Sequence, residues 1–349
     1  MKKANFRENS PFHESLHLAQ IHYISATNKS NVTTILFLGF QNISEVNVLL
    51  FIFFLVIYCV TICGNAFLIT LVSISKTLHS PMYFFVSQLS IADIILTTDI
   101  SPNMLNIVLH EQTSISISSC LTQCFFLGLL VVSDCLILTV MSYDRYMAIC
   151  SPLHYTSVMN HVHCIKLVLV SWLISSLISL IIVLNISQLQ FCGSNTIDHF
   201  FCDLNPLVKL LCSDVSEIQM EITLLSVPVI VLPFFVIIFS YVHIILTILK
   251  ISSLSGRQKA FSTCSSHLTI VSMFYGTLFG MYVLPNEGQS QTMNKAMSML
   301  YTVFTPFLNP FIYSLRNKDI KKAFRKVVGN LKFYSKTMTQ ENNKKLTDI

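Results

Sequence analysis

Charged residues are scarce in this chain. They make up 11% of its 349 residues, against roughly 25% in soluble domains. Hydrophobic residues reach 53%, and the mean hydropathy is +0.64. A soluble protein of this length could not cover its surface with so few charges, whereas a membrane removes that need. The composition therefore favours an integral membrane protein.

The sequence also lacks the marks of several functional classes. It shows no inverted repeat and no paired broken helices, which argues against the alternative of a channel or secondary transporter. It carries no nucleotide-binding or nucleic-acid signature. The neighbours Ser266 and His267 have no acid placed to orient them, so they do not indicate a catalytic set. We therefore expect a protein that is not an enzyme.

Seven apolar stretches are each long enough to cross about 30 Å of hydrocarbon as a helix. With the N-terminus outside, 16 of the 22 Lys and Arg residues fall on the cytoplasmic side, where these residues concentrate in membrane proteins. The sequence therefore predicts an all-α membrane protein, a seven-transmembrane helix bundle with the N-terminus outside and the C-terminus inside. The predicted spans are 46–72, 82–108, 120–147, 164–187, 218–249, 261–284 and 293–315.

The segment 1–45 precedes the transmembrane domain, 46–315. It carries glycosylation sequons at Asn28 and Asn31, which are more convincing because the segment is independently predicted to lie outside. We expect this extracellular segment to be disordered and glycosylated.

The cytoplasmic tail, 316–349, begins with apolar residues at helical spacing among basic ones. This pattern predicts an amphipathic helix over 317–331 that lies on the anionic inner leaflet. The helix would serve as an anchor, as a partner-contact surface, or as both. The apolar positions are Ile320, Phe324, Val327 and Leu331.

Four of the eleven cysteines fall on the outer side. An even number facing an oxidising space indicates two disulfides, with three pairings open. Such bonds would hold the long outer loop 188–217 as a lid. The string His199 to Asp203 also contains metal-ligand residue types, although Cys202 cannot be a thiolate ligand while it is in a disulfide. The four outer cysteines are Cys120, Cys192, Cys202 and Cys212.

Two acids, Asp93 and Asp134, lie deep in the predicted spans, with Asn65 and Asn309 at comparable depth. Acids at this depth are costly when they face lipid, so they should point into the bundle. Two carboxylates and two amides could bind a sodium ion with waters, or share a proton. The alternative is a hydrogen-bonded polar cluster that joins four helices.

Asp144 and Arg145 form an adjacent acid and base at the inner edge of the third span, followed by Tyr146. Arg145 alone could be an interfacial anchor. Because an ion pair can form and break, the two residues predict a two-state switch on the cytoplasmic face. Tyr241 and Tyr313 are candidates to stabilise its open state.

The seventh span contains Pro306 and Pro310 on either side of Asn309. Each proline removes a backbone hydrogen bond and bends a helix. The pair predicts a hinge beside Asn309, with a merely bent structural helix as the alternative.

Four strings together resemble the rhodopsin-like G-protein-coupled receptors and, within them, the odorant receptors. Mid-span tryptophan and proline, usual in the sixth span of rhodopsin-like receptors, are replaced by Phe274 to Thr277, as is typical of odorant receptors. Asp134 stands where glutamate is usual and Ser142 where alanine is usual. The four strings are Leu78–Phe85, Met141–Cys150, Lys259–Leu268 and Asn309–Asn317.

The resemblance implies the disulfides Cys120–Cys202 and Cys192–Cys212. The predicted activation switch comprises Asp144, Arg145, Tyr146, Tyr241, His267, Asn309, Pro310 and Tyr313. The resemblance also implies coupling to a heterotrimeric G protein of the stimulatory olfactory type, a rise in cyclic AMP, and a place in the plasma membrane of sensory-neuron cilia. A receptor of the same family that senses a metabolite outside the nose is the remaining alternative.

The ligand site is expected in the outer half of the bundle, because residues 128–132 lie roughly 20–25 Å from the cytoplasmic end at 1.5 Å per residue. Its lining is apolar with a few hydroxyls, which indicates a small, largely neutral organic ligand, an odorant. For any one of these residues, ordinary helix packing is the alternative. The candidates are Gly128, Val131, Val132, Leu225, Ser226, Val229, Tyr275, Tyr282 and Met299.

Overall fold

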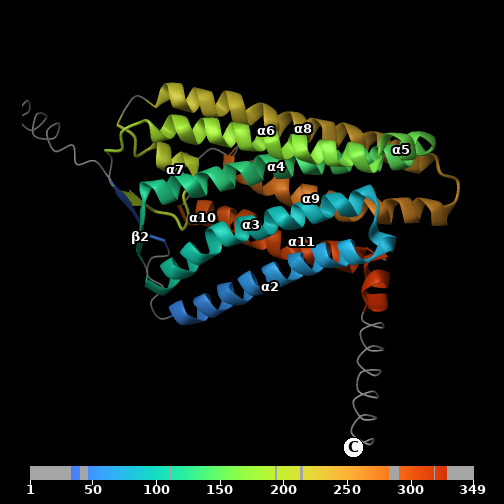
Figure 1. The fold of residues 1–349 in the computed structure, drawn as a ribbon, viewed down its shortest axis with the longest axis horizontal. Coiled ribbons are helices and arrows are strands. Elements are labelled where there is room, and N and C mark those ends of the chain that lie inside the picture. The colour runs from blue at the N-terminus through green and yellow to red at the C-terminus, as the bar shows by residue number, and fades with distance from the viewer. Residues whose placement is uncertain are drawn as a thin grey trace, which may run out of the picture.

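The computed structural model describes residues 33–39, 46–110, 112–192, 195–212, 215–282, 291–317 and 319–327. They form a bundle of long helices that run roughly along one direction, with a small sheet at one end (Figure 1). The long helices are α2 (Asn47–Ile74), α3 (Pro81–His110), α4 (Ile117–Cys150), α6 (His161–Ser187), α8 (Ser216–Lys250) and α9 (Leu254–Tyr282).

Each of the seven predicted spans coincides with helical structure, so the prediction of a seven-helix bundle is confirmed. Five of the helices, α2, α3, α4, α6 and α8, are each long and apolar enough to cross a membrane. The seventh span comprises α10 (Gln291–Met299), the π-helical turn η2 (Leu300–Phe304) and α11 (Thr305–Arg316).

A π turn at Leu300–Phe304 interrupts the α-helix of the predicted span 293–315. Pro306 has no N–H for the carbonyl four residues before it, so regular α-helical bonding cannot continue through this point. The hydroxyl of Thr305 instead donates to the carbonyl of Leu300, 2.9 Å away. The bend expected from the prolines thus takes the form of a π turn just before Pro306, a feature frequent at functional sites.

Helix starts follow local capping chemistry. α3 begins at Pro81, one residue before the predicted span 82–108, because proline at a first helical position needs no N–H partner. The Ser116 side chain accepts from the N–H of Ser119 at the start of α4, and the Asn160 side chain accepts from His163 at the start of α6.

α4 lies at the centre of the bundle. In its most apolar window 61% of residues are buried, against 11% in α8. Most of the apolar surface of α8 faces outward, including Leu232, Phe235 and Phe239, as it would toward lipid tails.

Short elements join the helices. The 3₁₀ turn η1 (Lys76–Leu78) links α2 to α3, and α5 (Pro152–Val158) follows α4. α7 (Leu204–Val208) lies in the connection between α6 and α8. Residues 319–327 are helical after α11 and run across the direction of the bundle (Figure 1). On this short helix Ile320 and Ala323 are buried.

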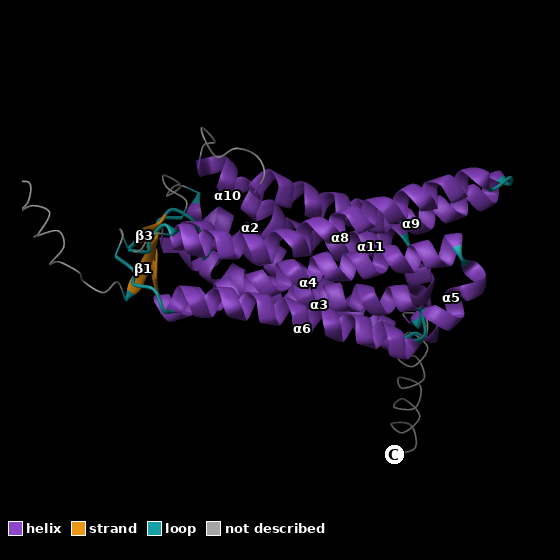
Figure 2. Ribbon diagram, turned by 90° about the horizontal axis from the view of Figure 1, so that it is seen from above, coloured by secondary structure: helices purple, strands orange, loops and turns teal. Residues whose placement is uncertain are grey.

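A three-stranded sheet of order β2-β1-β3 closes one end of the bundle (Figure 2). β1 (Thr34–Phe37) pairs antiparallel with β2 (Thr113–Ser116) and parallel with β3 (Thr196–Ile197). Ile35 and Phe37 of β1 are fully buried. We call this end the disulfide end and the opposite end, where α5 lies, the Arg145 end.

Strand β1 corrects the expectation that the whole segment 1–45 is disordered. The run Thr34-Ile35-Leu36-Phe37 alternates exposed and buried side chains, so one face of the strand packs on the bundle. The sequons at Asn28 and Asn31 lie outside the described residues, and so does the end of the predicted tail helix beyond residue 327.

Candidate functional site

At the Arg145 end, Asp144 and Arg145 form a closed ion pair inside α4. Nη2 of Arg145 lies 2.5 Å from Oδ2 of Asp144, and Nε donates to the same oxygen at 3.0 Å. Asp144 is fully buried and Arg145 nearly so. A buried pair of this kind is costly to separate unless another partner replaces one member.

Tyr155 of α5 completes this arrangement. Its hydroxyl donates to Oδ1 of Asp144 at 2.8 Å, so both carboxylate oxygens have partners. Burial raises the pKa of Tyr155, and the neighbouring Asp144 raises it further, so the phenol stays protonated and able to donate. The loop after α4 thereby holds Asp144 in the paired state.

Tyr241 of α8 does not contact Arg145 in this structure. Its hydroxyl lies 2.6 Å from Nδ1 of His267 on α9, and the two rings stack with centroids 5.8 Å apart. Both side chains are buried. Tyr146 is also turned away from Asp144, because its ring lies edge-on to His243 of α8 at 6.2 Å. α8 and α9 are therefore joined beside the ion pair.

Deeper in the bundle, Asn309 and Asp93 are joined as the sequence suggested. The amide of Asn309 donates to both carboxylate oxygens of Asp93, at 3.2 and 2.9 Å. Asp134 is 8% exposed and interacts electrostatically with Asp93. Among the described residues, Oδ1 of Asp134 and the side-chain oxygens of Asn65 and Asn309 are buried without a hydrogen-bond donor.

These donor-free oxygens suit a hard cation. Carboxylate and amide oxygens are the ligands that Na⁺, like Ca²⁺ and Mg²⁺, accepts. Buried oxygens without a donor are costly, so something is expected to satisfy them. A cation, waters or a proton on one carboxylate are the species that satisfy buried oxygens of this kind.

Asn65 has a further task at the proline hinge. Its amide donates to the carbonyl of Thr61 at 3.1 Å in its own helix and to the carbonyl of Pro306 at 3.2 Å. The Pro306 carbonyl lacks a helical donor because Pro310, four residues later, has no N–H. Gly64 lets α2 approach: a Cβ there would lie 3.1 Å from Cγ of Pro310.

Tyr313 lies between the Asp93 cluster and the Arg145 end. It is 1% exposed, so its phenol is buried inside the bundle. Its hydroxyl has no hydrogen-bond partner among the described residues. Such a hydroxyl is free to take a new partner when the helices move.

In the half of the bundle toward the disulfide end, Tyr275 and Val132 lie on neighbouring faces. The ring of Tyr275 packs on Phe234 of α8 with centroids 5.0 Å apart, and its phenol lies beside the thiol of Cys135. Val132 lies one helical turn before Cys135 on the same face of α4. The Tyr275 phenol is thus buried beside a thiol, a weak hydrogen-bond partner.

The remaining residues predicted to contact the ligand have different surroundings. A Cβ at Gly128 would lie 3.0 Å from Oγ of Ser179, so Gly128 serves the close packing of α4 on α6 rather than a cavity. The side chain of Tyr282 lies outside the described residues. The others are half-buried, and of these Val131, Leu225 and Met299 pack against the apolar core, whereas Ser226 and Val229 lie on the less buried α8.

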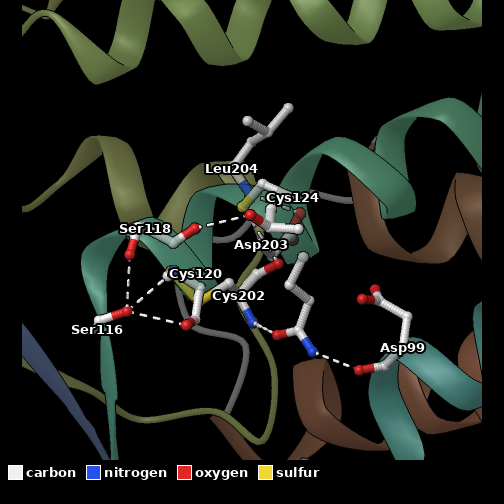
Figure 3. The surroundings of a disulfide bond; sticks show 11 residues. Asp99, Ser116, Ser118, Cys120, Cys124, Cys202, Asp203 and Leu204 are labelled. Carbon is white, nitrogen blue, oxygen red and sulfur yellow. Dashed lines mark hydrogen bonds between the residues drawn. A yellow bond between two sulfur atoms is a disulfide. The ribbon is translucent and has the colours of Figure 1, made fainter.

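The two disulfides join Cys120 to Cys202 and Cys192 to Cys212, the pairing expected from the resemblance. Gln123 strengthens the first connection. Its amide donates to the carbonyl of Asp99 on α3 at 2.8 Å, and its Oε1 accepts from the N–H of Cys202 at 2.8 Å. Figure 3 shows Asp99 and Cys124 near this disulfide. The loop is thus fixed to α4 by a covalent bond and a hydrogen bond, and the same Gln123 ties α4 to α3.

His199 and Cys202, the residues that suggested a metal site, are engaged elsewhere. Cys202 is in a disulfide. Nδ1 of His199 accepts from the N–H of Phe200 at 3.0 Å, and Nε2 lies 3.2 Å from Oγ of Ser298 on α10. Both ring nitrogens therefore already have partners, and metal binding is not supported.

Three residues important to this geometry were not predicted. Gln123 and Tyr155 carry no sequence signal, because a glutamine in a span and a tyrosine in a loop are common. Lys295 was counted only as a charge, yet it pairs with Asp198 and donates to the carbonyl of Gly39. The partners of these residues lie far away along the chain, so the sequence alone does not indicate the contacts.

Comparison with known proteins identifies the family. The family model described as "Olfactory receptor" matches residues 54–330. Human olfactory receptor 11L1 is 48% identical over 86% of this chain and 94% of its own length. Rat olfactory receptor 1f45 is 44% identical over 90% of this chain and 100% of its own length.

The fold has a solved counterpart. Squid rhodopsin superposes with a TM-score of 0.66 over 79% of this chain and 78% of its own, at 18% identity. At this identity the likeness shows the fold alone. The family matches show more: the chain is a multi-pass membrane receptor, not an enzyme, and it belongs to the olfactory receptor family.

Proposed function

We propose that this protein binds a small, mostly apolar odorant in the half of the bundle toward the disulfide end and activates a stimulatory olfactory-type G protein, raising cyclic AMP. The observation that carries the proposal is the closed Asp144–Arg145 pair, held by Tyr155. A buried arginine that is paired only with its neighbour can take another partner once the surrounding helices part.

The ligand is expected to contact Tyr275 and Val132. The apolar surroundings of Tyr275, with Phe234 and Phe274 packed on its ring, favour hydrophobic burial as the main source of affinity. The donor-capable hydroxyl of Tyr275 would select ligands with one hydrogen-bond acceptor. A ligand shifts the receptor only if it binds the open state more tightly than the closed one.

The path from ligand to switch runs along α9. Tyr275 and His267 are eight residues apart on this helix, and His267 holds Tyr241 beside the ion pair. Movement of α9 would separate His267 from Tyr241, and Tyr241 and Tyr313 would then be free to stabilise the released Arg145. The G protein would bind at the surface opened by this movement.

A sodium ion at Asp93, Asp134, Asn65 and Asn309 is proposed as an allosteric ligand of the closed state. The donor-free oxygens of this cluster support it. Because Asn309 lies next to Pro310, an ion there would link the hinge of the seventh span to two carboxylates.

Orientation and location follow from the charge pattern. The Lys and Arg bias favours the Arg145 end in the cytoplasm and the disulfide end outside, where disulfides persist. We propose the plasma membrane of sensory-neuron cilia as the location, with glycans at Asn28 and Asn31. The short helix 319–327 would then lie on the inner leaflet.

The test is cyclic AMP in cells that express this chain with an olfactory-type G protein, screened with a panel of small apolar odorants. Val132→Trp, which fills space beside Cys135, is the ligand-site variant, and Leu232→Trp on the exposed face of α8 is its control. A response lost only in Val132→Trp supports the proposed site. A response of equal strength in both variants contradicts it.

A further inference from the structure

The sheet at the disulfide end is fastened to the seventh span by one lysine. We define the cap as strands β1, β2 and β3 with residues 198–203, which follow β3. Lys295, in α10, forms an ion pair with Asp198, the residue directly after β3. The same ammonium donates to the carbonyl of Gly39, two residues after β1, at 2.6 Å. One side chain therefore holds two adjacent strands.

The Gly39 carbonyl reaches this lysine because of its backbone conformation. Gly39 has a φ of 51°, in the left-handed region that favours glycine. The chain turns there at the end of β1, and its carbonyl is directed at Nζ of Lys295. Lys295 is mostly buried, at 13% side-chain exposure, so water screens the contact with Asp198 only weakly.

A second contact lies one helical turn along the same face of α10. Ser298 lies three residues after Lys295, and its Oγ is 3.2 Å from Nε2 of His199. The neighbours Asp198 and His199 thus meet the neighbouring positions Lys295 and Ser298 on one helix face. Two aligned contacts fix the orientation of α10 against the cap, which a single flexible pair would not.

The cap covers a route into the bundle. Its own side chains Ile35, Phe37, Phe200 and Phe201 are completely buried, so the inner face of the cap packs on the bundle. The thiol of Cys124, also buried, contacts the carbonyl of Cys202 at 3.4 Å. The Cys120–Cys202 bond ties the cap covalently to α4, whereas its contacts with α10 are non-covalent and are the ones that can open.

We propose that the contacts of Lys295 with Asp198 and Gly39 hold the cap closed against α10. When these contacts break, the cap separates from α10, and this opening admits ligand to the bundle. The role in ligand entry rests on the proposed receptor function; the opening itself does not. α10 continues directly into the π turn η2, so opening also frees the part of the seventh span that bends most readily.

The first test is amide hydrogen exchange on the purified full chain in lipid nanodiscs, without ligand or G protein. The reporters are the N–H groups of Leu36 and Leu38, which bond to the carbonyls of Asn195 and Ile197 across β1 and β3. Loss of a charge-assisted contact should make exchange at these amides roughly tenfold faster in Lys295→Ala. Lys295→Arg, which keeps cation and donors, should stay near wild type.

Lys209→Ala is the matched control, because Lys209 is an exposed lysine of the same connection, after α7. It should leave exchange unchanged. Equal exchange in Lys295→Ala and wild type would overturn the proposal, and so would the same acceleration in Lys209→Ala.

A second measurement follows the route beneath the cap. A water-soluble maleimide should label Cys124, identified by its peptide mass, roughly tenfold faster in Lys295→Ala than in wild type. Equal labelling rates would contradict opening at this edge. Both readouts are independent of signalling, so a chain that fails to raise cyclic AMP would count against the proposed function and leave the cap to be judged by exchange and labelling.

Discussion

The amide of Asn65 donates a hydrogen bond to the backbone carbonyl of Pro306, 3.2 Å away in the seventh span. That carbonyl has no helical donor, because Pro310 lacks an N–H. Asn65 of the first span thus supplies the hydrogen-bond donor that the backbone of the seventh span lacks at Pro306. The contact explains how a helix with two prolines remains ordered inside the bundle.

Asn65→Ala should therefore destabilise the protein. It leaves a buried carbonyl unsatisfied, at a cost of about 1–3 kcal/mol. The expected result is a lower thermal unfolding temperature of the purified protein in detergent. Thr70→Ala is the control, since the exposed Thr70 bonds only to its own helix. Equal unfolding temperatures for Asn65→Ala and wild type would contradict the role given to Asn65.

Tyr155→Phe should raise ligand-free signalling. The change removes the hydrogen bond to Oδ1 of Asp144 while keeping the ring. A hydrogen bond to a charged group contributes about 1.5 kcal/mol, so the closed state should lose roughly tenfold in the switch equilibrium. Basal cyclic AMP at matched surface expression measures this. Ser157→Ala, on the exposed face of α5, should have no effect; an unchanged basal level in Tyr155→Phe would show that Tyr155 does not hold the switch.

Sodium should stabilise the purified receptor against heat, and Asp134→Asn should remove the effect. Replacing sodium by N-methylglucamine at constant ionic strength isolates the ion. If sodium is present at ten times its Kd, it contributes about 1.4 kcal/mol to the free energy of unfolding. A sodium-dependent shift that survives in Asp134→Asn would exclude this carboxylate as a ligand, and a wild type insensitive to sodium would leave the cluster as a hydrogen-bonded polar network.

The closed cap should weaken in acid. Burial lowers the pKa of His199 from 6.5 to about 4, with the charge of Lys295 acting in the same direction and Asp198 against it. Because the free histidine binds a proton more readily than the buried one, closure is fully stable above pH 6.5 and loses stability as the pH falls toward 4. The full loss is about 3 kcal/mol.

The amide exchange of Leu38, corrected for the intrinsic effect of pH, measures this loss. His199→Gln keeps a side chain able to bond Ser298 but does not titrate in this range, so it should flatten the dependence. The nearby titratable groups Asp198 and Lys295 remain in both proteins. The same slope in His199→Gln and wild type would assign the acid effect to other groups.

Much of the fold could be predicted from the sequence, because the signals are long and local. Hydropathy alone places seven helices, and the second predicted span, 82–108, begins within one residue of α3. Depth in the spans grouped Asp93 with Asn309 in one predicted set of polar residues, and their side chains are hydrogen-bonded. Polar side chains in a membrane span must point into the bundle, so those at the same depth are the available hydrogen-bond partners for one another.

The remaining features depend on contacts between distant segments. Four residues of β1 form a strand only because β2 and β3 lie on either side, so the sequence of the N-terminal segment alone did not indicate it. The sequence placed Gly128 on the same helix face as Val132. In the structure, however, Gly128 packs closely against Ser179 of α6. Periodicity identifies a face of a helix and does not identify what packs on it.

The most direct test of the account is cyclic AMP in response to odorant in wild type and Arg145→Ala, with surface expression matched. Lys166→Ala is the control, because it removes an exposed basic residue near the same end. The account predicts an odorant-dependent rise in wild type and Lys166→Ala that is lost in Arg145→Ala. An equally strong response in Arg145→Ala would contradict the proposed switch.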